Sequence, residues 1–214
     1  MSARIHIVDY GVGNLYSLAN ALREIGVEPL LSASPTEIAN AERVILPGVG
    51  AFPATYGTFK SRGMEDAIRK YLETERPMLG ICVGMQMLMT RSEEFGVTEG
   101  LGIMRGTVQK IADHGTDGKP HKIPHIGWTD VRPVDGGTAW KGTIFDGIAP
   151  DTSFYFVHSF TAKPEDESDR LADGFYNGQR ITASVTRGAV TGTQFHPEKS
   201  GEAGLDVLRN FARL

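Results

Sequence analysis

Apolar runs alternate with amphipathic segments along the first half of the chain, and this alternation limits the possible folds more than any other feature. The apolar runs lie at residues 5–8, 27–31, 44–46 and 77–81. Helices are predicted over residues 15–25 and 64–74, and two more are predicted to begin at residues 35–37 and 85–89. A short run without polar alternation is typical of a strand buried on both faces, and strands joined through helices pair in parallel. The first half therefore predicts a parallel sheet covered by helices.

The second half is richer in strands. The predicted strands are Ile103–Ile111, Trp128–Val131, Phe154–Phe160, Ile181–Val185 and Ala189–Phe195. Residues 113–119 and 163–170 are polar and predict exposed loops, whereas residues 201–213 predict a helix. No repeat or linker divides the sequence. We therefore expect one α/β domain over residues 1–214, with a mixed, mostly parallel central sheet flanked by helices.

Charge and cysteine content exclude several classes of protein. The chain of 214 residues has a formal net charge of −4 and no basic block, so it lacks the positive surface that nucleic-acid binding requires. The apolar run before Asp9 is too short for a secretory leader or a membrane span. The single cysteine cannot form an internal disulfide, which fits a reducing compartment. We therefore expect a cytoplasmic protein that binds neither nucleic acid nor membrane.

That single cysteine, Cys82, lies between Gly80 and Gly84, where a predicted strand meets a predicted helix. This is the spacing of a nucleophile elbow, whose tight turn lifts the nucleophile out of the sheet and leaves little room for side chains two positions away. The next backbone N–H then faces the oxyanion, and the start of the helix favours a thiolate. The alternative from this motif alone is that Cys82 is a small buried apolar residue.

A second motif, QFHPEKS, places His196 and Glu198 two positions apart. Pro197 favours an extended conformation for the residue before it, and side chains two apart in an extended segment point to the same side. A carboxylate beside an imidazole fixes its tautomer and supports its protonated form, as a general base requires. Taken alone, the motif is also compatible with a histidine that ends a strand beside a solvated carboxylate.

Together the two motifs predict acyl transfer by a Cys-His-Glu triad, in which a thiolate attacks a carbonyl and water releases the acyl group. A free-standing cysteine hydrolase of esters or peptides stays open. A nucleotide-binding module is disfavoured, because GVGNLY has Tyr16 in place of the third glycine. No C-x-x-C or H-E-x-x-H pattern occurs, and Pro124 interrupts the pair His121 and His125, so we expect no metal and no cofactor.

Six segments, in order over nearly the whole chain, resemble the class I, triad-type glutamine amidotransferases. GICVGMQ and QFHPEKSG carry the triad, and the segments that narrow the resemblance are DYGVGNLYSL, PGVGAF, HIGW and YFVHSF. Within that family they are most similar to the glutaminase subunits of imidazole glycerol phosphate synthases, which serve histidine biosynthesis. A glutaminase subunit of a related synthase with a different acceptor has the same triad and stays open.

The resemblance implies a role for each matching residue. Cys82 is expected to attack the side-chain amide of glutamine, His196 to transfer the proton, and Glu198 to orient His196. The oxyanion hole is expected from the backbone N–H of Val83 and from an N–H at Val49 or Gly50, in a strand that reorients in this family. The residues expected to hold glutamine are Gly50, Gln86, His158, Ser159 and Phe160, the last two through their backbone.

The resemblance also implies a partner. The ammonia is expected to pass through a channel to a cyclase subunit with a (β/α)8 barrel, in a heterodimer that forms imidazole glycerol phosphate and AICAR. The residues that match interface positions are Trp128, Tyr155 and Lys199. Two positions depart from the family pattern: Thr129 follows HIGW in place of asparagine, and Val83 follows Cys82 in place of leucine. Only the backbone of Val83 is expected to act, so the second departure leaves the triad unaffected.

Overall fold

The computed structural model describes residues 4–134 and 140–214. Its helices are α1 (Leu15–Glu24), α2 (Pro35–Ala39), α3 (Phe52–Ser61), α4 (Met64–Leu72), α5 (Val83–Gln86) and α6 (Gly201–Arg213), with the 3-10 turns η2 (Glu167–Asp169) and η3 (Pro197–Lys199). Its strands are β1 (Ile5–Val8), β2 (Pro29–Ser32), β3 (Arg43–Gly48), β4 (Met78–Cys82), β5 (Met89–Ser92), β6 (Thr98–Glu99), β7 (Met104–Lys110), β8 (His125–Pro133), β9 (Thr152–His158), β10 (Phe160–Pro164), β11 (Arg170–Tyr176), β12 (Gln179–Arg187) and β13 (Val190–Thr193). No helix in these two ranges is long and apolar enough to cross a membrane.

The large central sheet has nine strands in the order β2-β1-β3-β4-β13-β12-β11-β8-β9. The strands from β2 to β13 pair in parallel, and those from β13 to β9 pair antiparallel. The predicted α/β class with a mixed sheet flanked by helices is therefore confirmed. Parallel pairing is confined to one half of the sheet, because the strands from the second half of the sequence enter mainly as hairpins, which pair antiparallel.

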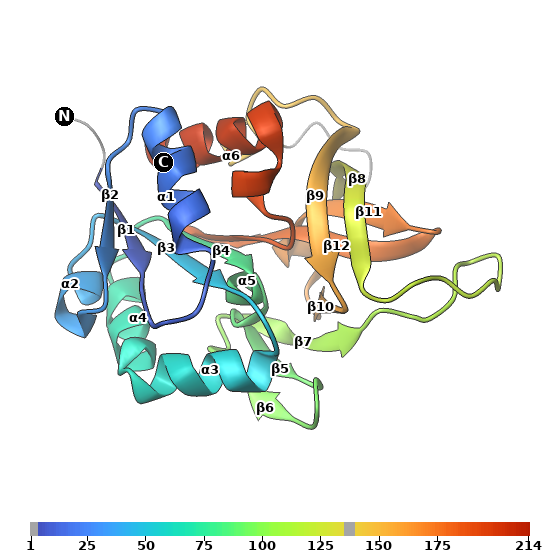
Figure 1. Cartoon of the computed structure of the whole chain (residues 1–214), viewed down its shortest axis with the longest axis horizontal. Coiled ribbons are helices and arrows are strands. Elements are labelled where there is room, and N and C mark those ends of the chain that lie inside the picture. The colour runs from blue at the N-terminus through green and yellow to red at the C-terminus, as the bar shows by residue number, and fades with distance from the viewer. Residues whose placement is uncertain (1–3, 135–139) are drawn as a thin grey trace.

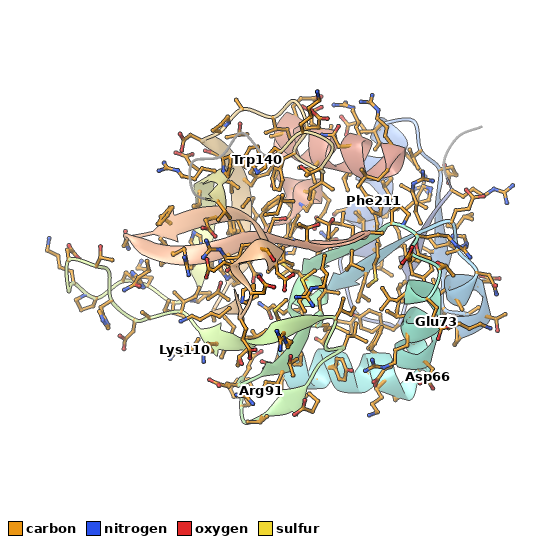
Figure 2. All side chains as sticks on the ribbon, turned by 180° about the vertical axis from the view of Figure 1, so that it is seen from behind. Asp66, Glu73, Arg91, Lys110, Trp140 and Phe211 are labelled. Carbon is orange, nitrogen blue, oxygen red and sulfur yellow. The ribbon has the colours of Figure 1, made fainter. Side chains whose placement is uncertain are left out.

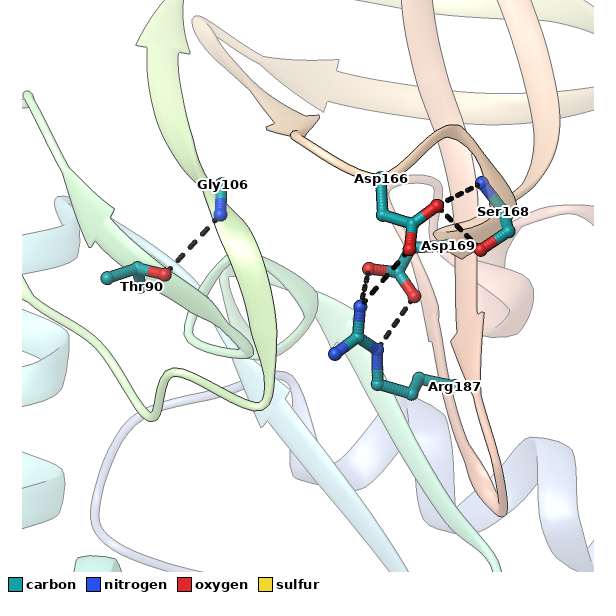
Figure 3. Close-up of polar contacts among 6 residues, drawn as sticks. All are labelled: Thr90, Gly106, Asp166, Ser168, Asp169 and Arg187. Atoms are coloured by element: carbon teal, nitrogen blue, oxygen red, sulfur yellow. Dashed lines mark hydrogen bonds and ion pairs between the residues drawn. The ribbon is translucent and has the colours of Figure 1, made fainter.

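A second, smaller sheet was not predicted. It has the order β10-β7-β5-β6 and lies below the large sheet in Figure 1. Strands β5 and β7 pair in parallel, and the backbone N–H of Gly106 also donates to the hydroxyl of Thr90 at 3.4 Å (Figure 3). This sheet occupies the place where the sequence predicts a helix from Met85 to Met89. A helix does follow Cys82, as predicted, but α5 is a single turn that ends at Gln86, and Met89 already belongs to β5.

Helices cover both faces of the parallel half of the large sheet. In Figure 1, α1 and α6 lie on one face, and α3 and α4 lie on the other. Each helix buries an apolar stripe and exposes a polar one, as expected for a surface helix: Ile68 of α4 is fully buried, whereas Asp66 and Glu73 lie on its outer side in Figure 2. The same view shows Phe211, a buried residue of α6.

Most elements of the first half, and the last helix, are confirmed, with ends that differ by a few residues. Local sequence explains their bounds. Gly26 follows α1 with a left-handed φ of +80°, which a glycine adopts at little cost. Ser34 caps α2 by accepting a hydrogen bond from the N–H of Glu37 at 3.4 Å, and Pro35 stands at the first helical position.

The predicted strand over Phe154–Phe160 is in fact two strands that belong to different sheets. Strand β9 ends at His158 and pairs with β8 in the large sheet, whereas β10 begins at Phe160 and pairs with β7 in the small one. Ser159 lies between them. The apolar composition of the segment does not reveal such a change of sheet, because it does not show which strand each part pairs with.

The predicted loop over residues 163–170 is only partly a loop. Strand β10 reaches Pro164, η2 covers residues 167–169, and Arg170 opens β11. Asp169 is buried, and both its carboxylate oxygens accept hydrogen bonds from Arg187, at 2.8 and 2.6 Å (Figure 3). Paired charges of this kind allow a polar stretch to leave the surface, which a hydropathy pattern does not predict.

Candidate active site

Cys82 stands at the junction of β4 and α5 with a left-handed φ of +55°, which a residue with a side chain rarely adopts. The two neighbouring glycines are required by space. A Cβ added to Gly84 would lie 1.9 Å from the carbonyl oxygen of Leu46, and a Cβ on Gly80 would lie 2.8 Å from the carbonyl oxygen of Gly84. The predicted elbow and its crowding are therefore confirmed. Helix α5 is a single turn, so it supports the thiolate less than the predicted longer helix would.

Strand pairing brings the second motif to the first. Strand β13 lies beside β4 in parallel, with Gly192 opposite Gly80, so the segment after β13 emerges at the same edge of the sheet as Cys82. Phe195 is fully buried and stacks on Phe154 of β9 at 4.2 Å between ring centroids, which fixes the residue before His196. As a result His196 lines the same cavity as Cys82.

His196 and Glu198 form the expected pair. Nδ1 of His196 lies 2.9 Å from Oε1 of Glu198, and both side chains are buried. The predicted extended path is only half right. His196 itself is extended, with φ −101° and ψ 100°, but Pro197 to Lys199 form the 3-10 turn η3. The hydroxyl of Ser200 donates to the carbonyl of His196 at 2.7 Å and holds this turn in place.

Burial and neighbouring charges act in opposite directions on His196. Burial disfavours the imidazolium, but hydrogen bonding and charge attraction to Cys82 and Glu198 outweigh it, and together they raise the pKa of His196 to about 10. Its Nε2 atom is buried and makes no hydrogen bond of ordinary geometry to another described residue. The arrangement favours a protonated imidazole next to Cys82, and such a neighbour is what activates a cysteine nucleophile.

A cavity of about 350 Å³ opens in front of the thiol. The residues expected from the sequence that line it are Val49, Gly50, Cys82, Val83, Gln86, His158, Ser159, Phe160, His196 and Lys199. Glu198 is not among the lining residues; it contacts His196 from behind. The structure therefore brings nearly all of the predicted triad, oxyanion and substrate residues to one place, although they come from four separate parts of the chain.

The segment expected to supply part of the oxyanion hole is bounded by two hydrogen bonds. The Tyr10 hydroxyl donates to the carbonyl of Pro47 at 2.6 Å, and the Thr55 hydroxyl donates to the carbonyl of Val49 at 2.8 Å. Gly50 follows with a left-handed φ of +87°, a conformation that glycine adopts readily. On the other side of Cys82, Val83 is the first residue of α5, so its backbone N–H has no partner within that helix.

Gln86 lies at the centre of a buried amide network. Its Nε2 donates to the carbonyl of Phe160 at 3.1 Å and to Oε1 of Gln194 at 3.0 Å, and Gln194 in turn donates to the sulfur of Cys82 at 3.7 Å. Sequence reasoning missed Gln194, although it stands two residues before His196. Its importance follows from its complete burial and its partners, which only the folded structure shows.

Sequence reasoning also missed Glu94. Its carboxylate lines the cavity, although the residue is only 8% exposed, and Oε2 accepts the backbone N–H of Phe52 at 2.7 Å. A carboxylate in a substrate cavity provides a site for a cationic group of the substrate. In the sequence, Glu94 belongs to the polar stretch SEEFG, which has the composition of an exposed turn, so no local pattern distinguishes it.

The expected interface residues do not all lie together in the cavity. Trp128 of β8 is 57% exposed, so it is not a core residue, and its ring meets that of Tyr155 on β9 edge to face, with 6.0 Å between centroids. Ile126 on the same strand is also exposed. Lys199, in contrast, lines the cavity. An exposed tryptophan beside another aromatic ring is typical of a surface that contacts another protein.

Comparison with known proteins agrees with this geometry. The sequence profile of the family "Glutamine amidotransferase class-I" matches residues 6–214. The chain is 44% identical over 210 residues to "Imidazole glycerol phosphate synthase subunit HisH 1" of Legionella pneumophila (strain Lens), covering 98% of this chain and 99% of that one. It is 41% identical over 209 residues to "Imidazole glycerol phosphate synthase hisHF, chloroplastic" of Arabidopsis thaliana, covering 97% of this chain and 33% of that one.

A solved structure shows the same fold at low sequence identity. The protein described as "Structure of PurLQS from Thermotoga maritima" aligns with a TM-score of 0.72 and 22% identity, covering 100% of this chain and 99% of that one. This likeness supports the fold, whereas the family profile and the full-length relatives identify the family. Together they establish that the chain belongs to the class I glutamine amidotransferase family, as a glutamine amidotransferase enzyme.

Proposed function

We propose that this chain is the glutaminase subunit of an imidazole glycerol phosphate synthase and acts in histidine biosynthesis. It hydrolyses glutamine to glutamate and ammonia, and the ammonia passes to a cyclase subunit that forms imidazole glycerol phosphate and AICAR. The observation that carries the proposal is the elbow thiol of Cys82 facing one cavity with His196, in a chain similar to HisH subunits over its full length.

The chemistry follows from the positions of the three triad residues. His196 accepts the thiol proton of Cys82, and the thiolate attacks the carbon of the glutamine side-chain amide. The tetrahedral oxyanion is stabilised by the N–H of Val83 and by an N–H at Val49 or Gly50. His196 then gives its proton to the leaving nitrogen, so ammonia departs and a thioester remains. Water, activated by His196, hydrolyses the thioester to glutamate, and Glu198 keeps the imidazole oriented throughout.

The cavity also has groups that fit the rest of the substrate. Gln86 is held by its Nε2, so its carbonyl oxygen stays available, and Gly50, His158, Ser159 and Phe160 line the same cavity. The Glu94 carboxylate complements the α-ammonium group of glutamine, and Lys199 is a second charged residue that lines the cavity.

The proposed partner is a cyclase with a (β/α)8 barrel, in a heterodimer. Trp128 and Tyr155 form the aromatic part of the contact, and Lys199 lines the cavity. The match between this chain and about one third of a plant protein described as hisHF supports a partner activity of the kind carried by the rest of that protein. We also infer a single domain over residues 1–214, a cytoplasmic location, and catalysis without a metal or cofactor.

The test is glutamine hydrolysis by the purified chain, alone and with a barrel cyclase carrying an analogue of its substrate. We expect slow release of glutamate by the chain alone and a large increase in the complex, because we expect the segment at Val49 and Gly50 to reorient when the cyclase binds. Cys82→Ala should abolish hydrolysis in both cases and still bind the cyclase.

Two results would overturn the proposal. One is full glutaminase activity of Cys82→Ala. The other is rapid hydrolysis of simple esters by the free chain together with no response to the cyclase, which would indicate a free-standing cysteine hydrolase.

A further inference from the structure

A chain of hydrogen bonds runs from strand β8 into the active site. The Thr129 hydroxyl lies 2.8 Å from Nε2 of His125, and Nδ1 of His125 lies 3.0 Å from Nε2 of His158. Nδ1 of His158 lies 2.8 Å from the carbonyl oxygen of Phe160. His125 and His158 are direct register partners on the antiparallel strands β8 and β9, so the backbone ladder places the two rings against each other.

We propose that Thr129 and His125 are positioning residues of the glutaminase site, which fix His158 as the neutral Nδ1–H tautomer and thereby orient the Phe160 carbonyl and Gln86. This inference rests on the proposed function for its activity readout. Neither Thr129 nor His125 lines the cavity, so both act only through His158. Thr129 is also one of the two positions at which this sequence departs from the family pattern.

The direction of every hydrogen bond follows from the last acceptor. The carbonyl oxygen of Phe160 can only accept, so Nδ1 of His158 must carry a hydrogen. In the neutral ring Nε2 then accepts, and its partner Nδ1 of His125 must donate. Nε2 of His125 is left as an acceptor, and the Thr129 hydroxyl donates to it. Both histidines are therefore Nδ1–H tautomers, and no other neutral arrangement satisfies all three contacts.

The surroundings keep both rings neutral. His125 is 2% exposed and His158 is 6% exposed. Burial lowers the pKa of His125 to about 4, and repulsion from His121 adds to it. Burial lowers the pKa of His158 to about 3. The hydrogen bond to the Phe160 carbonyl opposes this shift, and repulsion from His125 and His196 adds to it. A proton on Nε2 of His158 would face the N–H of His125, so this hydrogen-bond arrangement also opposes protonation of His158.

The other groups near the pair do not change this conclusion. Glu94, Lys199 and the thiol of Cys82 line the cavity with His158. The ring of His125 stacks on Phe156 at 5.3 Å and on Tyr176 at 4.2 Å between centroids, so aromatic faces cover it. These stacks hold the plane of the ring and leave only its two nitrogens to make polar contacts.

The carbonyl of Phe160 connects this chain to the nucleophile. It accepts from His158 and also from Nε2 of Gln86, whose second N–H reaches Gln194 and through it the sulfur of Cys82. If His158 were free to exchange its donor and acceptor nitrogens, the carbonyl would lose one of its two donors. Gln86 and the backbone that lines the substrate cavity would then lose their fixed position.

The first experiment reads the tautomers directly. Ring ¹⁵N spectra of the ¹⁵N-histidine-labelled wild type at pH 7 should show two histidines with a protonated Nδ1 and an unprotonated Nε2, assigned to His125 and His158 by their loss in single variants. An Nε2–H tautomer or a charged ring at either residue would overturn the proposal. This measurement does not depend on glutaminase activity, so it decides the tautomers even if the proposed function fails.

The second experiment measures glutamine hydrolysis by His125→Phe, which keeps the stacked ring and removes both nitrogens. We expect KM for glutamine to rise about tenfold, the usual effect of one lost hydrogen bond to a buried group, with a smaller change in kcat. The acid limb of kcat/KM should move to higher pH, because His158 no longer faces a donor. The matched control is His121→Phe. His121 stacks on the same Tyr176, but its Nε2 contacts the carbonyl of Ala112 and takes no part in the hydrogen bonds that lead to His158. KM and kcat of this variant should therefore stay at wild-type values.

Thr129→Val provides a second test of the positioning role if His125→Phe does not fold. It removes only the hydroxyl and should shift the acid limb in the same direction by a smaller amount, and Thr129→Ser should restore the wild-type profile. Equal KM values and pH profiles for Thr129→Val, His125→Phe and His121→Phe would refute the positioning role. Wild-type protein without any glutaminase activity would instead refute the proposed function.

Discussion

His196 and Glu198 have different roles in catalysis, so replacing each of them should have different consequences. His196→Ala removes the group that moves the proton, so kcat for glutamine hydrolysis should fall by about 10²–10⁴-fold. Glu198→Gln should lower kcat far less, because its amide oxygen can still accept from Nδ1 of His196. Steady-state kinetics in the cyclase complex measures both. Glu202→Gln, a change on the exposed side of α6, is the control, and an equal loss for His196→Ala and Glu198→Gln would contradict the division of roles.

The histidines also set how stability depends on pH, with opposite signs. In the folded protein the pKa values of His125 and His158 are about 4 and about 3, below the ordinary value of 6.5. Between each of these values and pH 6.5, the unfolded chain therefore binds more protons than the folded one. Their contribution to stability is complete above pH 6.5 and is lost as the pH falls toward 4 and below. The pKa of His196 is raised to about 10, so its contribution is complete below pH 6.5 and is lost as the pH rises through 10.

The acid side of this dependence can be tested by urea unfolding between pH 7 and pH 4.5. The free energy of unfolding of the wild type should decrease as the pH falls through this window, and His125→Phe should decrease less steeply, because one of the two groups is gone. His114, which is exposed, provides the control: His114→Phe should keep the wild-type slope. Parallel curves for all three proteins would show that His125 is not held neutral by the fold.

At the scale of single elements, the short turn around the nucleophile leaves no room for an added methyl group. Gly84→Ala drives a Cβ against the carbonyl oxygen of Leu46, so we expect a loss of about 1–3 kcal/mol in unfolding free energy from overpacking and a large loss of activity. Gly57→Ala is the matched change in α3, where a Cβ would meet nothing within 4 Å. It should stabilise the protein by about 0.5–1 kcal/mol through helix propensity.

Chemical unfolding and glutaminase assays on the two alanine variants check this pair. Similar activity and stability for Gly84→Ala and Gly57→Ala would mean that the elbow can relax without cost. Any stabilisation seen only for Gly57→Ala would identify propensity, rather than packing, as its cause, because the added methyl group has no neighbours there.

Elements with a strong local pattern could be predicted from the sequence, and those that depend on distant partners could not. Strand β4 is an uninterrupted apolar run, β1 is apolar except for His6, and α6 has a clear amphipathic stripe. Helix α3 was missed because Pro53 and Gly57 weaken its helical pattern. Strand β11 was missed because it carries the buried Asp173 beside Arg170, an ion pair that forms only when the sheet is assembled.

The same distinction holds for the site. Cys82, His196 and Glu198 lie in short motifs whose spacing expresses their geometry, so sequence reasoning found them. Glu94 and Gln194 have no such local sign, because their importance comes from the strands and helices that surround them. The hydrogen bonds between His125, Thr129 and His158 likewise depend on the register of β8 and β9, which no pattern within one strand reveals.

For the whole molecule, the exposed aromatic surface around β8 and β9 predicts where a partner binds. Trp128→Ala should weaken binding of the barrel cyclase by about 10–100-fold, because an exposed tryptophan at an interface often contributes about 2 kcal/mol or more. The control is Phe95→Ala, a more exposed aromatic at 86% that lies between β5 and β6 on the small sheet. Titration calorimetry measures both affinities. Equal losses, or none for Trp128→Ala, would place the contact elsewhere.

The adjacency of β4 and β13 has a consequence for how the protein is made. The thiol of Cys82 is synthesised early, but the imidazole that activates it follows β13, more than a hundred residues later, and reaches it only when β13 docks beside β4. A nascent chain on the ribosome therefore carries the sulfur without its base until β13 and η3 have emerged. An incomplete chain therefore lacks the triad that cleaves glutamine, and this activity arises only when the large sheet is complete.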